Sequence, residues 1–522
     1  MGNKRYVIFV AAVVSIGGFL FGFDAAVISG VNSFITAEFD LTSLQLGTVV
    51  ASVTISSAAA MLAAGSISDQ IGRKRILIFV ALLYSISAIF SALAPSYLTL
   101  VIARLVGGLA FGAALVLVPV YIAEIVPAKM RGSMVSINQL AIVIGFSAAY
   151  FSNYYMLQLS KSGSDFAVAN NLSENIWRWM LGIEAIPALI YFLCLFFIPR
   201  SPRWLLMKGN EEEAKDVLTK VNGPEEGKVI LSEIKGSIQS ELNNEKISFI
   251  KSLDKLFQHK YRKILLVAVV VGIAQMSVGI NAVFFYATNI FELTGIGTDA
   301  SFVQSVWVGI INVLFTFLAI LLIDRVGRRP LLLAGLFGIT ISLLVVAYGF
   351  KQSTYTLTAE KIAQLEIDID KSKLDPLVGK QFNDDVAFGQ AVVDQLGRSD
   401  AALHKGEIIK AAGHLNAILI LMGILGFVAC FAFSLGPVMW VLLSEIFPNA
   451  IRGIAISSVG FINSLTSYFV VQFFPWQLET FGNTITFVIY AIFAAVALVI
   501  LLKILPETKG KTLEELEIEL AN

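Results

Sequence analysis

Charged residues, cysteines and histidines are scarce in this chain. Only 15% of its 522 residues carry a charge, against roughly 25% in an average soluble domain. The 38 basic and 38 acidic residues balance, so no basic surface for nucleic acid is expected. The two cysteines, Cys194 and Cys430, lie within apolar runs, and with only three histidines they form no metal-ligand spacing. We therefore expect no metal site, no cofactor and no nucleic-acid partner.

Apolar residues are abundant instead. They make up 57% of the chain, and the mean hydropathy is +0.78, which indicates an integral membrane protein. The apolar runs extend for about 20 residues without alternation, which is typical of membrane helices rather than barrel strands. We predict an all-α fold with twelve transmembrane helices, at about 6–37, 43–67, 76–95, 97–123, 133–157, 177–198, 262–291, 302–323, 331–350, 414–443, 454–475 and 482–505.

Basic residues mark alternate short connections and set the expected topology. Lys and Arg cluster after the second, fourth, eighth and tenth runs, whereas Glu38, Asp40, Glu292 and Asp299 lie in connections on the other side. The positive-inside rule then places both termini in the cytoplasm. The first run is far longer than the core of a signal peptide, so we expect it to be retained as a helix.

Two connections are long. Residues 200–260 are rich in Glu and Lys and contain helix-like runs such as 211–221, which predicts a cytoplasmic linker of short amphipathic helices. Residues 351–413 are polar and predict an external insertion with several helical stretches.

The chain repeats itself. Asp69–Arg75 recurs as Asp324–Pro330, and Glu124 with Arg131 recurs as Glu445 with Arg452, seven residues apart in both copies. The repeat predicts two six-helix bundles, at 1–199 and 261–505, followed by a short tail at 506–522. Parallel repeats of this kind hold the substrate path at their interface.

Asp24 is a carboxylate inside the apolar stretch 17–30. At the centre of a membrane helix an Asp costs about 2.5–3.5 kcal/mol on insertion scales, so such a residue is usually functional. It lies 14 residues from Glu38, about 21 Å deep, which is too far for a short side chain to reach the interface. We predict a proton carrier; a structural ion pair is the alternative.

Arg104 and Glu184 are two further charges in apolar runs. Arg104 is the expected partner of Asp24, although a long Arg can also reach the membrane interface. Glu184 is expected at about the depth of Arg104, where it could titrate jointly with Asp24 or be the true partner of Arg104.

Six short motifs occur in order between these runs: Asp69–Arg75, Pro199–Arg203, Gln275–Asn281, Asp324–Pro330, Gly436–Trp440 and Pro506–Gly510. With them the chain resembles the sugar porter family of the major facilitator superfamily over nearly its whole length, and in particular its bacterial sugar/proton symporters. The resemblance implies the major facilitator fold. It also implies pairing of Asp24 with Arg104, because facilitative members of the family have Asn in place of this Asp.

The resemblance also implies a sugar site. Several of the implied residues are Asn or Gln, whose side-chain amides suit sugar hydroxyls because an amide both donates and accepts hydrogen bonds. From spacing alone, these amides could equally join neighbouring helices by hydrogen bonds. Met276, Ser464 and Phe146 stand where relatives have polar or larger groups, which leaves the identity of the sugar open. The implied substrate-binding residues are Gln139, Gln275, Asn281, Asn312, Trp440, Phe285, Tyr286 and Asn463.

Glycines predict two bends. Gly279 and the pair Gly436-Pro437 lie where the seventh and tenth helices are expected to break and to permit gating.

The repeated cytoplasmic motifs predict a gate in which ion pairs hold the inner side shut; the alternative is that these charges only set topology. The predicted gate residues are Asp69, Gly72, Arg73, Glu124, Arg131, Asp324, Gly327, Arg328, Glu445 and Arg452.

Together these features predict a proton-coupled monosaccharide (pentose or hexose) symporter that works by alternating access and is not an enzyme. The alternatives are a facilitative uniporter of a sugar or of a polyol such as inositol, and a sugar sensor, which the short tail disfavours. We expect a monomer in the bacterial inner membrane, with a sugar, a proton and the lipid bilayer as its partners.

Overall fold

A computed structural model describes residues 4–243, 256–258, 261–365, 367–447 and 451–509. Within these residues, eleven helices are long and apolar enough to cross a membrane. The last of them, α25 (Arg452–Ile504), contains Gly482 at a φ of 77°, a conformation that divides it into two helices. The described chain therefore holds twelve spans, as the hydropathy pattern predicts.

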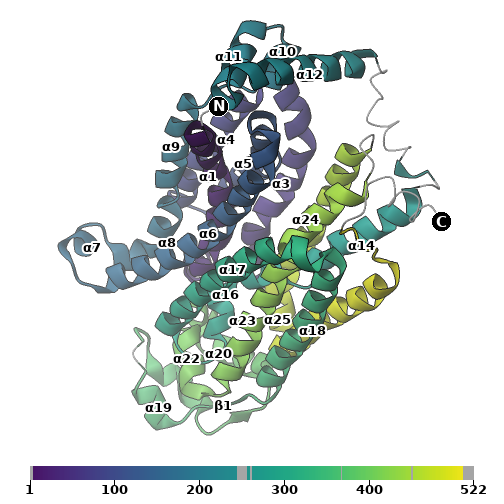
Figure 1. Cartoon of the computed structure of the whole chain (residues 1–522). Helices are drawn as coiled ribbons and strands as arrows, with labels where there is room; N and C mark the ends of the chain where they lie inside the picture. The colour runs from purple at the N-terminus through teal and green to yellow at the C-terminus, as the bar shows by residue number, and fades with distance from the viewer. Residues whose placement is uncertain (1–3, 244–255, 259–260, 366, 448–450, 510–522) are drawn as a thin grey trace.

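The helices form two groups, the N-terminal one purple to blue and the C-terminal one teal to yellow in Figure 1. The domain boundaries assigned from the sequence stay predictions. The N-terminal spans are α1 (Lys4–Val27), α3 (Ser43–Ile71), α4 (Arg73–Ala92), α5 (Tyr97–Ile125), α6 (Ala128–Lys161) and α8 with α9 (Leu172–Gly182, Ala185–Cys194). The C-terminal spans are α14 with α15 (Arg262–Ser277, Ile280–Phe285), α17 (Thr298–Val326), α18 (Arg328–Lys351), α23 with α24 (Ala417–Phe433, Leu435–Ile446) and the two parts of α25.

The repeated motifs form the same tight connection in both halves. Gly72 separates α3 from α4 at a φ of 106°, and Gly327 separates α17 from α18 at a φ of 103°. A Cβ atom at Gly72 would lie 3.0 Å from the Trp204 ring, and one at Gly327 would lie 2.7 Å from the Glu507 carboxylate. The backbone angle therefore requires glycine in each copy, and at Gly72 the Trp204 ring also leaves little room for a Cβ atom.

Both predicted helix breaks are present. The seventh span stops at Ser277 and resumes at Ile280 after Gly279, which has a φ of 88°. The tenth span breaks at Ser434 (φ −129°, ψ −93°), two residues before Gly436-Pro437. The break in the tenth span thus lies two residues earlier than predicted. Pro437 itself lies in the first turn of α24, where a missing N–H costs nothing.

The two halves are joined at the end predicted to be external. Tyr150 on α6 donates to the carbonyl of Phe284 at 2.7 Å. The first span continues through a 3₁₀ turn (Ile28–Gly30) into α2 (Asn32–Phe39), and Asn32 donates to the carbonyl of Phe285 at 3.0 Å. These contacts connect the two halves at this end, and we call the set of such contacts the external closure.

The described part of the linker contains helices, as predicted: α10 (Pro202–Met207), α11 (Glu211–Asn222) and α12 (Pro224–Asn243). The external insertion contains helices and also a small antiparallel sheet of order β2-β1-β3, which the sequence did not predict. Its elements are β1 (Thr354–Thr356), α19 (Ala359–Ala363), a 3₁₀ helix (Lys371–Leu377), β2 (Gln381–Phe382), α20 (Asp385–Leu396), α21 (Arg398–Leu403), α22 (Lys405–Ala412) and β3 (Gly413–His414).

Candidate functional site

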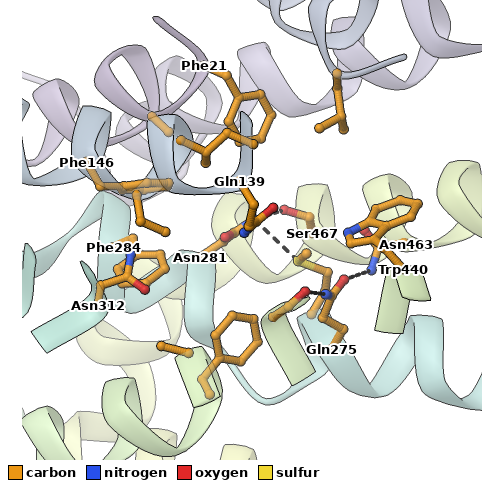
Figure 2. A pocket seen from close by; sticks show the side chains of 18 of the residues that line it. Phe21, Gln139, Phe146, Gln275, Asn281, Phe284, Asn312, Trp440, Asn463 and Ser467 are labelled. Carbon is orange, nitrogen blue, oxygen red and sulfur yellow. Dashed lines mark hydrogen bonds between the residues drawn. The ribbon is translucent and has the colours of Figure 1, made fainter. Parts of the chain in front are cut away.

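A pocket lies between the halves and is lined by side chains from both (Figure 2). The N-terminal half contributes residues of α1, α3, α5 and α6, and the C-terminal half contributes residues of α14, α15, α17, α23, α24 and α25. Seven of the eight residues expected at the sugar site line this pocket: Gln139, Gln275, Asn281, Phe285, Asn312, Trp440 and Asn463. Their roles in binding stay predictions.

Three of the pocket amides are held by hydrogen bonds within the C-terminal half. Gln275 donates to the carbonyls of Leu435 at 2.9 Å and Gly436 at 3.2 Å, just beyond the break in the tenth span. Asn463 donates to the Gln275 side-chain oxygen at 2.9 Å. Asn281 donates to the hydroxyl of Ser467 at 2.7 Å. These bonds fix the amides and tie the bends in the seventh and tenth spans to α25.

Gln139 and Asn312 differ from the other amides. Gln139 comes from α6 and Asn312 from α17, so each half supplies one of them to the pocket (Figure 2). Among the residues that the structure describes, neither side chain has a protein hydrogen-bond partner. Both amides are therefore available to a polar ligand.

Aromatic side chains form much of the remaining wall. Trp440 lines the pocket beside Asn463, and Phe146 and Phe284 pack with ring centroids 4.8 Å apart (Figure 2). Tyr286 is not among the residues that line the pocket: its ring packs against Phe474, and its hydroxyl donates to the carbonyl of Val471 at 3.1 Å.

Sequence reasoning missed several small polar residues of the pocket. Thr54 and Ser57 on α3 line it from the N-terminal half, and Thr316 on α17 and Ser467 on α25 line it from the C-terminal half. Their only sequence signal is a hydroxyl on the interior face of an apolar helix, which is common where helices pack.

Asp24 and Arg104 form a buried ion pair. The guanidinium of Arg104 donates through Nη1 to Oδ1 of Asp24 and through Nη2 to the Asp24 carbonyl at 3.4 Å. Glu184, between α8 and α9, interacts electrostatically with both. Each of the three residues is at most 3% exposed, and none is among the residues that line the pocket. The structure thus brings together the three charges that the sequence singled out, apart from the sugar site.

The cytoplasmic motifs form ion pairs within each half. Arg73 contacts Asp69 at 2.6 Å and Glu124 at 3.0 Å. In the second copy Arg328 contacts Asp324 at 3.0 Å and Glu445 at 2.6 Å. These pairs connect the ends of three helices in each half and repeat the same geometry.

Another predicted gate residue, Arg452, makes a backbone contact in the described chain instead of such a pair. Arg452 donates to the carbonyl of Phe447 at 3.1 Å. The side chain of Arg131 lies outside the described residues. The role of all these residues as a gate stays a prediction.

Glu292 is a charge that sequence reasoning assigned to an external connection. It is only 3% exposed and accepts a hydrogen bond from Ser33 of the N-terminal half at 3.0 Å. Burial raises its pKa to about 7, against the weaker opposite effects of Ser33 and Lys405. Glu292 is therefore part of the external closure.

The twelve-helix bundle, the pocket between its halves and the six sequence motifs together narrow the choice of protein family. The family model for "Sugar (and other) transporter" matches residues 10–364 and 402–520. The chain belongs to this family. It is therefore a multi-pass membrane protein for sugar transport with the major facilitator fold, and not an enzyme, as the sequence predicted.

Individual members of the sugar transporter family are similar over almost their full length. An arabinose-proton symporter of Bacillus subtilis is 33% identical, covering 99% of this chain and 95% of the relative. A D-xylose-proton symporter of Escherichia coli is 34% identical, covering 99% and 96%. A glucose transporter of Staphylococcus epidermidis is 32% identical, covering 100% and 98%.

Solved structures of a sugar transporter also align with this chain over almost its full length. The inward open conformation of the xylose transporter XylE from Escherichia coli aligns with a TM-score of 0.74 at 31% identity, covering 98% of this chain and 99% of that one. The same transporter bound to 6-bromo-6-deoxy-D-glucose aligns with a TM-score of 0.71 at 32% identity, covering 99% and 100%.

Proposed function

We propose that this sugar transporter is a proton-coupled symporter of a pentose or hexose that works by alternating access. The observation that carries the proposal is the buried cluster of Asp24, Arg104 and Glu184. It holds two carboxylates against one guanidinium, so with both carboxylates ionised it has one uncompensated negative charge in a low-dielectric interior. Binding one proton makes the cluster neutral, which favours one proton per cycle.

Protonation changes how Arg104 is held. In this proposal Asp24 takes the proton and a Glu184 carboxylate is left to balance the guanidinium, so the charge pairing shifts from α1 toward the sixth span. Because α1 also lines the sugar pocket through Phe21 and Ala25, a small movement of this helix is transmitted to the bound sugar. Proton binding and sugar binding are then coupled through α1, because this one helix belongs to both sites.

The substrate class is supported by the named relatives, which transport arabinose, xylose or glucose. A binding screen over pentoses, hexoses and inositol, read as ligand-induced stabilisation, identifies the sugar. Stabilisation by inositol alone contradicts a monosaccharide substrate.

The decisive experiment uses an Asp24→Asn variant in proteoliposomes with an acidic exterior. We expect it to keep sugar exchange but to lose accumulation against a gradient, because an amide cannot exchange the proton. Asp165→Asn, at an exposed site on α7 (Asp165–Ala169), is the matched control and should accumulate sugar like the unsubstituted protein. If Asp24→Asn accumulates sugar as well as the control, the symport proposal is wrong and a uniporter remains.

A further inference from the structure

The proposed proton site is separated from the sugar pocket. Asp24 shares α1 with Phe21 and Ala25, and these two line the pocket whereas Asp24 does not. Asp24 is 2% exposed, and its Oδ2 atom has no hydrogen-bond partner among the described residues. If this cluster carries the coupled proton, as proposed above, the sugar pocket in this conformation offers that proton no direct way out to the cytoplasm.

Two helices present aligned positions on the cytoplasmic side of this cluster. Gly17 lies seven residues before Asp24 on α1, and Tyr191 lies seven residues after Glu184 on α9, about two turns in each case. A Cβ atom on Gly17 would lie 2.8 Å from the hydroxyl of Tyr191. The glycine therefore makes room for this hydroxyl on the cytoplasmic side of the cluster.

The tyrosine hydroxyls next to the cluster are buried and have no partner. Tyr84 on α4 is 1% exposed and Tyr191 is fully buried. Within the described part of the chain, neither hydroxyl has a hydrogen-bond partner. Tyr84 interacts electrostatically with Asp24, Glu184 and Tyr191, so it lies close to both the carboxylates and the second hydroxyl. Unpaired buried hydroxyls are uncommon and call for an explanation.

A third tyrosine, Tyr121, lies on the cytoplasmic side of Tyr84 and Tyr191. Val118 on α5 flanks the same glycine, with its Cγ2 atom 3.0 Å from the Cβ position at Gly17. Tyr121 lies one turn further toward the cytoplasm and interacts with Tyr191, Tyr6 and Glu124. Its hydroxyl donates to the carbonyl of Pro199 at 2.6 Å, at the cytoplasmic end of the sixth span.

Glu124 completes the series at the cytoplasmic motif. Its carboxylate accepts hydrogen bonds from Arg73 at 3.1 Å and from Ser201. The polar groups thus run from the buried cluster to the cytoplasmic ends of the helices, entirely within the N-terminal half.

We propose that Tyr84, Tyr191 and Tyr121 form a proton relay from the Asp24–Glu184 carboxylates to Glu124. Each hydroxyl accepts a proton on an oxygen lone pair and passes its own proton to the next acceptor, directly or through a bridging water. No hydroxyl gains or loses a proton overall. The relay lets the proton leave without entering the sugar pocket.

The test uses Tyr84→Phe and Tyr191→Phe, singly and together, because Phe keeps the ring and removes only the hydroxyl. Exchange of labelled for unlabelled sugar at equal pH needs no proton release and should be unchanged. Net uptake driven by external acid should fall about tenfold in the double variant, and its solvent deuterium isotope effect should rise because proton transfer becomes rate-limiting. Tyr355→Phe, a buried tyrosine of the external insertion, is the matched control and should be normal in both assays.

Three results overturn the relay. The first is net uptake by the double variant equal to that of the control. The second is a parallel fall of exchange and net uptake, which assigns the tyrosines a structural role. Absence of proton-driven accumulation by the unsubstituted protein removes the symport proposal and the relay with it. The first two results leave symport intact, so the failures are distinguishable.

Discussion

At the residue scale, the pocket contains two kinds of side-chain amide: those already hydrogen-bonded within the protein and those available to a ligand. Gln275 uses both amide hydrogens on backbone carbonyls, and its oxygen accepts from Asn463. Gln139 and Asn312 have no such bonds in the described chain. We therefore expect a sugar hydroxyl to gain most from these two side chains, one on each half, and alternating access, as proposed, to bring them together around the sugar.

We predict that Gln139→Ala and Asn312→Ala each raise the KM for sugar exchange by about three- to tenfold, because one neutral hydrogen bond is worth about 0.5–1.5 kcal/mol. Labelled-sugar exchange in proteoliposomes measures this. Gln390→Ala, at an exposed amide on α20, controls for loss of a glutamine at a site remote from the pocket. Unchanged KM values in both pocket variants would place the sugar elsewhere.

At the element scale, the seventh span connects the pocket with the external closure. It is broken at Gly279, carries Asn281 and Phe285 into the pocket, and continues as α16 (Ala287–Glu292). Ser33 on α2 donates to Glu292, and Asn289 donates to Ser33 at 2.9 Å. We therefore expect any rotation about the break to move the pocket and the closure together.

We predict that this closure depends on pH through Glu292. Its pKa is raised from 4.5 to about 7 mainly by burial, while Ser33, Lys405 and Asn289 lower it and Glu407 raises it. The closed state thus binds the proton more tightly than an opened, solvated state, so the closure is strongest in acid and weakens as pH rises through about 7. Glu292→Gln should remove this dependence.

Hydrogen exchange of α2 and α16 between pH 5 and 8, corrected for the intrinsic effect of pH on exchange, measures the opening. Protection should fall with rising pH in the unsubstituted protein and in the control Glu360→Gln, at an exposed carboxylate of α19. The same slope in Glu292→Gln would show that another group controls the closure.

The helices were predictable because they depend on local sequence, whereas the polar side chains that line the pocket were predictable only through the family resemblance. Twenty-residue apolar runs form helices in any bilayer, and a glycine such as Gly279 breaks them. The surroundings of Tyr286 and Glu292 were not predictable. Tyr286 lies at the junction of α15 and α16 and packs against Phe474, a residue far away in the sequence. Glu292 becomes buried because distant parts of the chain fold over it, and its local sequence carries no sign of this.

At the scale of the whole molecule, the external insertion acts as a cap for the C-terminal half. Asp385 of α20 accepts a hydrogen bond from the backbone N–H of Asn483 at 2.7 Å, where the twelfth span begins after Gly482. Glu407 of α22 accepts one from the N–H of Thr298 at 3.1 Å, where α17 begins. The first N–H groups of a helix lack partners, and a carboxylate there also offsets the helix dipole. One insertion thus supplies the missing caps of two transmembrane helices.

We predict that Asp385→Ala and Glu407→Ala each destabilise the protein by about 1 kcal/mol, the usual value of a helix N-cap. Because the two carboxylates cap different helices, the losses should add in the double variant. Thermal unfolding in detergent measures them, with Asp375→Asn as the control at an exposed carboxylate of the same insertion. Unfolding midpoints equal to that of the control would mean that the insertion lies on the bundle without stabilising it. A lower midpoint with normal sugar exchange at moderate temperature would assign the insertion to stability rather than to transport.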